Sequence, residues 1–212
     1  EGEGWYNRDS TAVISVDRYH YDDQTRHKFV NWSDDVHGDT SVVVPLIMDS
    51  PKMVTANWQK QYHLTVDNSG YGIARGDGWY DEGSEAVFSI APPIITMEGD
   101  SQYVFIEWIG SGKGAYSGGD ISHNITINNP VSEKAHWDLH YKVTTSTVPA
   151  WGGSIQFSSG NEWYNKGERV TVTAIPAGNT DYEFSYWSGD LSGNANPENI
   201  IIDNPKNICA HF

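Results

Sequence analysis

The chain has 212 residues, which is enough for one large domain or for two to three small ones. Its formal net charge is −15, which argues against a nucleic-acid binder, because such proteins present a basic face to phosphate. Only 38% of the residues are hydrophobic, but 13% are aromatic, and disordered chains are poor in aromatic residues. No apolar run is long enough for a membrane span, and no signal peptide is visible. We therefore expect a folded acidic protein that does not insert into a membrane.

Three stretches of the sequence resemble one another. Each begins with a Trp-Tyr pair, continues into alternating apolar residues, and then has an aromatic segment that ends on Trp. Each closes with a Pro-containing turn and a segment that ends on an aromatic residue. The landmarks are Trp5, Trp32 and Trp58 in the first stretch, Trp79, Trp108 and Trp137 in the second, and Trp163, Trp187 and Phe212 in the third. Because chance does not readily place such landmarks in one order three times, we predict tandem repeats over residues 1–58, 61–137 and 140–212.

The expected elements follow one order in each repeat. A hairpin comes first in the second and third repeats, over 62–74 and 141–157. The first repeat has only four residues before Trp5, so its hairpin either lies upstream of Glu1 or is absent from this repeat. Further strands are expected at 12–16, 29–32 and 54–58 in the first repeat, at 86–90, 105–108 and 133–137 in the second, and at 170–174, 184–187 and 208–212 in the third.

Residue periodicity assigns the fold class. The apolar residues alternate with a period of two and are rich in Val and Thr, and no helical stripe is visible, although one short helix per repeat remains an alternative. The linkers 59–61 and 138–140 are short and lack Pro and Gly. We therefore predict an all-β fold of three small β-rich repeat domains, sandwich-like or β-grasp-like, that form an elongated rod.

Alternation also assigns faces in the closing strands. Ile208 and Ala210 share the inner face of the third repeat, and Cys209 lies on the outer face. In the second repeat, Glu133 takes the place that Val54 has in the first. Because a buried carboxylate is costly without solvent or a partner, we expect Glu133 to lie at an edge.

The third repeat carries the most specific pattern. Residues 182–193 read Tyr-x-Phe-x-x-Trp-Ser-Gly-Asp-x-Ser-Gly and are followed by Ile-Asp-Asn-Pro-Lys at 202–206. Together with the segments 62–66 and 79–83, this pattern resembles the divergent internalin-B B-repeat family. The resemblance implies tandem repeats of large bacterial or archaeal surface or secreted proteins, with no catalytic residues. The second repeat departs from the pattern, because Trp108 is followed by Ile-Gly-Ser in place of Ser-Gly-Asp.

These observations favour one function and leave two alternatives. We expect a non-catalytic, extracellular repeat segment of a prokaryotic cell-surface or secreted protein, acting as a stalk, spacer or adhesion module, and not an enzyme. No glycine-framed serine motif for nucleophilic catalysis appears. The alternatives are a glycan- or protein-binding module and accessory repeats of a secreted hydrolase.

Most tryptophans recur at the same place in each repeat, as core residues do. Trp151 is different, because it lies in the loop Pro149–Gly153 and matches no aromatic residue of the other repeats. We therefore predict that Trp151, with Tyr116 in another loop, contacts a partner such as a cell-surface glycan or protein.

Other candidate sites are weaker. Asn31 and Asn124 each begin the Asn-x-Ser/Thr pattern of N-glycosylation, and Asn124 is the better candidate. The acidic clusters, such as Asp34-Asp35, favour a solvated surface, and a structural calcium ion is the alternative. His136 and His140 lack the flanking residues of a zinc site. We expect no metal and no cofactor.

Overall fold

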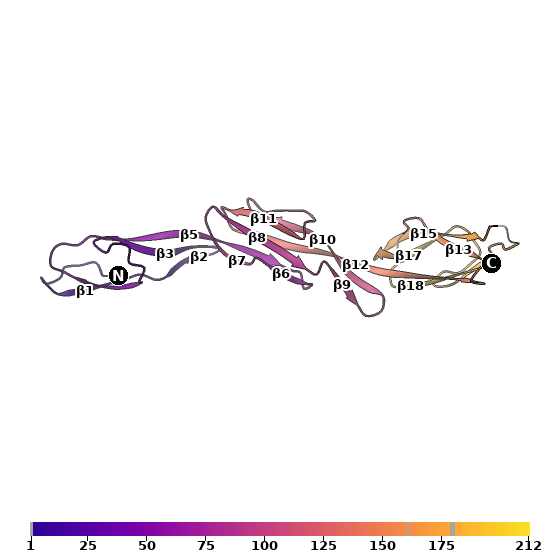
Figure 1. The fold of residues 1–212 in the computed structure, drawn as a ribbon, viewed down its shortest axis with the longest axis horizontal. Helices are drawn as coiled ribbons and strands as arrows, with labels where there is room; N and C mark the ends of the chain where they lie inside the picture. Colours follow the sequence, from indigo (N-terminus) through magenta and orange to yellow (C-terminus); the bar gives the residue numbers. More distant parts are fainter. Residues whose placement is uncertain (1, 161, 179–180) are drawn as a thin grey trace. The chain divides into compact units, whose positions relative to one another are not determined.

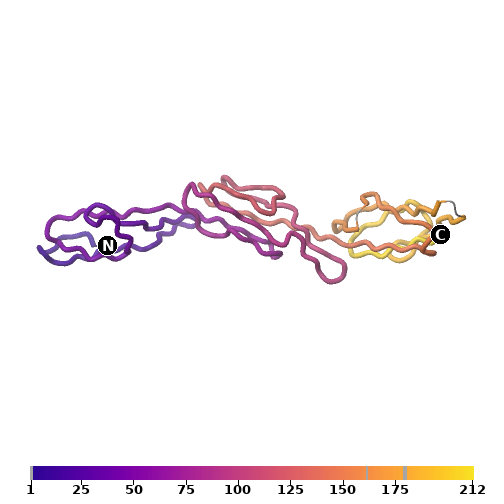
Figure 2. The backbone as a smooth tube through the Cα atoms, viewed as in Figure 1, coloured from indigo at the N-terminus to yellow at the C-terminus, as the bar shows by residue number. Residues whose placement is uncertain are grey.

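The computed structural model describes residues 2–160, 162–178 and 181–212, and Figure 1 shows β-strands throughout this part of the chain. The all-β prediction is confirmed, because no helix is assigned in these residues. Accordingly, they hold no helix long and apolar enough to cross a membrane. The chain divides into two compact units, whose backbone can be followed by colour in Figure 2. Unit 1 comprises Glu1–Asp67, Ala74–Ile90 and Trp108–Lys134, and unit 2 comprises Asn68–Ile73, Ala91–Glu107 and Ala135–Phe212.

Unit 1 holds the first predicted repeat and most of the second. β1 pairs antiparallel with β4, and β3 lies between β2 and β5. β8 lies between β11 and β6 in a three-stranded sheet. The strands wholly or mainly in this unit are β1 (Thr11–Ser15), β2 (Tyr19–Asp22), β3 (Thr25–Asp34), β4 (Val43–Ile47), β5 (Val54–Asp67), β6 (Ile73–Arg75), β7 (Gly78–Asp81), β8 (Ser84–Ala91) and β11 (Ser122–Ile127).

The long strand β5 belongs to two predicted repeats. Its first half pairs antiparallel with β3, where Trp58 lies opposite Phe29. Its second half pairs antiparallel with β7, where Leu64 lies opposite Gly78, and parallel with β12 (Val131–Val148), where Leu64 lies opposite Val131. The predicted linker 59–61 lies inside this strand, so these two repeats are joined by hydrogen-bonded backbone and not by a loop.

Unit 2 holds the third predicted repeat. β15 lies between β13 and β17, and β12 pairs parallel with β18, where Val143 lies opposite Lys206. β12 also pairs with β14, β18 pairs with β16, and β9 pairs with β10. The remaining strands are β9 (Ile94–Met97), β10 (Ser101–Ser111), β13 (Gly153–Phe157), β14 (Trp163–Asn165), β15 (Glu168–Pro176), β16 (Tyr186–Gly189), β17 (Glu198–Ile202) and β18 (Lys206–His211).

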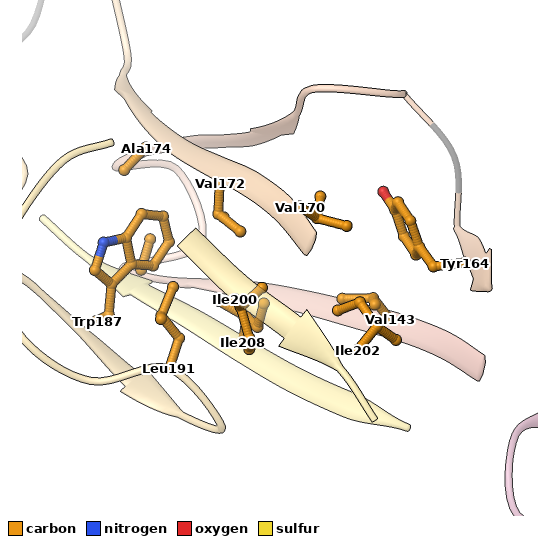
Figure 3. Packing of buried hydrophobic residues seen from close by; sticks show 11 residues of the cluster. Val143, Tyr164, Val170, Val172, Ala174, Trp187, Leu191, Ile200, Ile202 and Ile208 are labelled. Carbon is orange, nitrogen blue, oxygen red and sulfur yellow. The ribbon is translucent and has the colours of Figure 1, made fainter. Parts of the chain in front are cut away.

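The core of unit 2 lies between two layers of strands, as Figure 3 shows. Alternate residues of β15 and β17 point inward from one layer, because a strand presents every second side chain to the same face. Trp187 and the inner residues of β12 and β18 fill the space from the other layer. The buried members are Val143, Tyr164, Val170, Val172, Ala174, Trp187, Leu191, Ile200, Ile202, Ile208 and Ala210.

Unit 1 has a smaller core in its first predicted repeat and a second group of buried residues in the next repeat. The first is built around Phe29 and Trp32, whose ring centres lie 5.2 Å apart. The second is built around Phe88 and Trp108, whose rings meet edge to face at 5.0 Å. The other buried residues are Ile14, Val36 and Val44 in the first group and Ala86, Ile90, Ile125, Ile127 and Val131 in the second.

The expectation that the recurrent tryptophans are core residues is correct for only some of them. Trp32, Trp108 and Trp187 are buried. In contrast, Trp5 is fully exposed and Trp58 is 38% exposed, so the prediction is wrong for both. The remaining three, Trp79, Trp137 and Trp163, are half-buried.

The expected edge position of Glu133 is also wrong. Glu133 is completely buried, in a part of β12 that pairs with β5 and lies opposite Val66. β10 also pairs with β12, so β12 is a central strand and not an edge. One carboxylate oxygen of Glu133 accepts a hydrogen bond from the backbone N–H of Tyr116 at 2.8 Å. A backbone donor therefore takes the place of solvent as the partner of this carboxylate.

Candidate functional site

The same hydrogen-bond arrangement surrounds the three buried tryptophans. In each, the backbone N–H donates to one carbonyl of the following loop, and the indole N–H donates to the carbonyl two residues further on. All six distances lie between 2.7 and 3.0 Å. The two acceptors are Asp39 and Ser41 for Trp32, Gly118 and Asp120 for Trp108, and Gly193 and Ala195 for Trp187. These indoles are committed to holding loops and are not available to a ligand.

A turn carboxylate completes this arrangement in two of the three places. Asp35 accepts from the backbone N–H of Met53 at 2.6 Å, and Asp190 accepts from that of Asn207 at 2.7 Å. The second predicted repeat has Ser111 at this position. There, Glu133 on the closing strand supplies the carboxylate that holds the loop instead.

Tyr116 lies inside the loop that Glu133 holds. Its ring stacks on His123 with centres 3.7 Å apart, and its hydroxyl oxygen accepts from the backbone N–H of Asp120 at 3.4 Å. Burial raises the pKa of Tyr116 above its usual value. The hydrogen bond with His123, together with that of Tyr116, lowers the pKa of Asp120. The structure thus places this predicted contact residue, half-buried, in a network of loop interactions.

Trp151 lies on a tight turn between β12 and β13 and is 71% exposed. The turn is closed by a hydrogen bond from the Gly152 N–H to the Pro149 carbonyl at 2.9 Å. The indole N–H of Trp151 donates to the hydroxyl of Tyr182 at 3.0 Å. This bond orients the ring while leaving most of its surface in solvent, as recognition by an aromatic side chain requires.

The two predicted glycosylation residues lie in different surroundings. Asn31 is half-buried next to a bulge in β3, and its side-chain oxygen accepts from the amide of Asn57 at 2.9 Å. Asn124 is exposed on β11, a strand at the edge of its sheet. The geometry therefore favours Asn124 as the acceptor, as the sequence did, and glycosylation stays a prediction for both residues.

An aromatic cluster around Arg26 was not predicted from the sequence. The Arg26 guanidinium carbon lies 4.2 Å from the centre of the Tyr19 ring and 4.6 Å from that of Trp79. Its Nε donates to Gln61 Oε1 at 2.7 Å, and the Gln61 amide donates to Asp81 at 2.7 Å. These residues come from β3, β2, β7 and β5, so no local signal could have joined them. Cation–π contacts contribute about 0.5–1 kcal/mol each at exposed sites and more where they are desolvated, and Arg26, Tyr19 and Trp79 are half-buried, so the cluster stabilises the contact between these strands.

Within residues 2–160, 162–178 and 181–212, no group of three or more His, Cys, Asp or Glu side chains could hold a metal ion. Cys209 is a free thiol with its sulfur 3.7 Å from His211 Nε2, and that nitrogen lies 2.8 Å from the Ser188 hydroxyl.

The fold is all-β, and three of its loops are held by buried tryptophans with the same hydrogen-bond arrangement. The family model of the divergent InlB B-repeat domain matches residues 143–212. This match confirms the resemblance to the family that was predicted from the sequence of this stretch. The family suggests a surface-protein repeat module and is typical of surface or secreted proteins. A search of curated proteins and a search of solved structures found no match.

Proposed function

We propose that this chain is a non-catalytic spacer segment of a surface or secreted protein, built to hold other parts of that protein at a distance. The family match of residues 143–212 supports this role. No residue of the chain is assigned a catalytic role in this proposal.

The observation that carries the proposal is the shared strand β5. It closes the β3 sheet with its first half and pairs with β7 and β12 with its second half. A strand that is hydrogen-bonded to β3 along its first half and to β7 and β12 along its second half resists bending far better than a free linker, because bending would break ladder hydrogen bonds. Two consecutive modules joined in this way are held at a fixed distance from each other.

Distance measurements between spin labels test this proposal. The labels are placed at Val30→Cys and Val87→Cys, two exposed positions of unit 1, in a Cys209→Ser background that removes the free thiol. We expect a narrow distance distribution for this pair. Insertion of six Gly/Ser residues between Gln59 and Lys60, inside β5, should broaden it severalfold. An equally broad distribution without the insertion would refute the spacer role.

The exposed Trp151 favours a second function, binding of a glycan or protein partner. A glycan array is the first test, with Trp151→Ala as the variant. The matched control is Trp5→Ala, because Trp5 is also exposed but lies elsewhere. Binding that is lost in Trp151→Ala and kept in Trp5→Ala would support this function. Binding unchanged in both variants would exclude Trp151 as the contact residue.

A further inference from the structure

An open groove of about 500 Å³ runs beside β1 in the first predicted repeat. Its walls include Ala12 and Ile14 of β1, Trp32 of β3, and Val54 and Ala56 of β5. Val54 and Ala56 are only half-buried, although alternation places them on the inner face. The groove therefore exposes apolar side chains of β1 and β5, while Glu3 and Lys52 also line it.

In the other predicted repeats a β-hairpin lies in the corresponding place. In the second, Leu64 of the first hairpin strand is completely buried and pairs parallel with Val131 of the closing strand. In the third, Val143 is buried in the same way and pairs parallel with Lys206. The second hairpin strand, β6 or β13, pairs with β8 or β15. The strand that corresponds to β8 and β15 is β1, which pairs only with β4 among the described residues.

Two exposed tryptophans of the first predicted repeat have counterparts in the second repeat that contact its hairpin. Trp79, the counterpart of Trp5, packs edge to face on His63 of the first hairpin strand at 5.0 Å. Trp137, the counterpart of Trp58, donates from its indole to the carbonyl of Asn68 in the hairpin turn at 3.1 Å. Among the residues that the structure describes, no corresponding hairpin contacts Trp5 or Trp58, which accounts for their exposure.

The backbone at Gly2 already has the conformation that follows such a hairpin. Gly2 has φ 109° and Gly76, which directly follows β6, has φ 103°. A Cβ on Gly2 would lie 2.8 Å from the Val13 carbonyl oxygen, as one on Gly76 would lie 2.5 Å from that of Val87. The hydroxyl of the following tyrosine donates to the glycine carbonyl in both places, at 2.8 Å from Tyr6 and 2.9 Å from Tyr80.

We propose that the groove is the binding site of a β-hairpin of the B-repeat kind, whose second strand leads directly into Gly2. Its first strand runs parallel to β5 and places alternate apolar side chains against Val54 and Ala56. Its second strand pairs antiparallel with β1 and leads into Gly2. The hairpin is expected to bind there because both strand edges gain hydrogen bonds and the groove is filled. The proposal does not depend on the spacer role.

The test grafts the chain's own hairpin into the groove. Residues 60–75 are added ahead of Gly2 in place of Glu1, so that Arg75 joins Gly2 as it joins Gly76 in the second repeat. Hydrogen exchange by NMR then compares the grafted and original chains. We expect exchange at least tenfold slower for β1 and Val54–Asn57 amides on the groove side, and for the indole N–H of Trp58.

The control graft carries Asp at the added copies of Leu64, Val66 and Ile73, so it has the same length but cannot place apolar side chains against Val54 and Ala56. Slow exchange in the apolar graft alone supports the proposal. Equal exchange in the two grafts would overturn it. It would also be overturned if the original chain showed the same protection in a concentration-dependent manner, since a second copy would then occupy the groove. The distance between spin labels at Val30→Cys and Val87→Cys tests the spacer role separately.

Discussion

At the scale of single residues, Glu133 is the least expected feature. Its carboxyl is buried, and only one of its two oxygens has a hydrogen-bond partner among the described residues. Burial raises the pKa of Glu133, while the N–H of Tyr116 and the charge of His123 act in the opposite direction. The folded state therefore holds the proton of this group more tightly than the unfolded state does.

This shift predicts a pH dependence. Because the folded pKa is the higher one, the stability that Glu133 contributes is present below its unfolded pKa of about 4.5 and is lost as the pH rises through the folded pKa. Glu133→Gln keeps an oxygen acceptor for Tyr116 and does not titrate. In urea titrations between roughly pH 4 and pH 7, we expect the free energy of unfolding of Glu133→Gln to fall less than that of the wild type. Glu107→Gln, at an exposed position, is the control. Parallel pH profiles for wild type and Glu133→Gln would contradict the prediction.

A substitution of Trp187 is expected to lower the free energy of unfolding. Trp187→Phe leaves a cavity in the core of unit 2 and removes the indole donor from the Ala195 carbonyl. We expect a loss of about 2–3 kcal/mol in the free energy of unfolding, measured by circular dichroism in urea. The exposed Trp151→Phe should change it by less than about 0.5 kcal/mol. Equal effects of the two changes would mean that the Trp187 hydrogen bond and packing contribute little.

At the scale of elements, the start of β13 is fixed by close packing. A Cβ on Gly153 would lie 2.4 Å from both the Ile175 carbonyl oxygen and the ring of Phe212. This glycine lets β13 pair with β15 while the closing aromatic residue covers the turn that carries Trp151. The exposed position of Trp151 is therefore decided by strand packing two residues away.

Gly153→Ala tests this packing. We expect the variant to lose about 1–3 kcal/mol of stability, because backbone and an aromatic ring must move to admit the methyl group. Gly178→Ala is the control, since a Cβ there meets nothing within 4 Å. Thermal unfolding measures the loss, and the NMR shifts of the Phe212 ring report whether it has moved. A midpoint unchanged from the control variant would show that the turn adapts freely.

At the scale of the whole molecule, charge is the dominant feature. The formal net charge of −15 makes like charges repel one another in the folded state, and salt screens this repulsion. We expect the thermal midpoint to rise by roughly 2–4 °C, or about 1 kcal/mol, between low salt and physiological salt. Differential scanning calorimetry with NaCl at constant pH measures this rise. A midpoint that falls with salt would mean that attractive ion pairs, such as Lys206 with Asp203, outweigh the repulsion.

The sequence by itself determined the features that depend on neighbours along the chain. Alternation placed strands such as β1, β8 and β15, and it assigned Ile208 and Ala210 to an inner face. The recurrent pattern predicted the resemblance to the divergent InlB B-repeat domain, whose family model matches residues 143–212. These features are local, because a strand's side chains alternate whatever lies beside it.

Only the tertiary structure decided which strands lie side by side. The parallel pairing of β5 with β12 buries Glu133, and the meeting of β2, β3 and β7 surrounds Arg26 with aromatic rings. Trp5 and Trp79 occupy the same place in the repeat pattern, yet Trp79 packs on His63 while Trp5 is exposed. Whether a residue is buried depends on the strand that lies beside it as much as on the residue itself. That neighbouring strand is supplied by residues that are distant in the sequence.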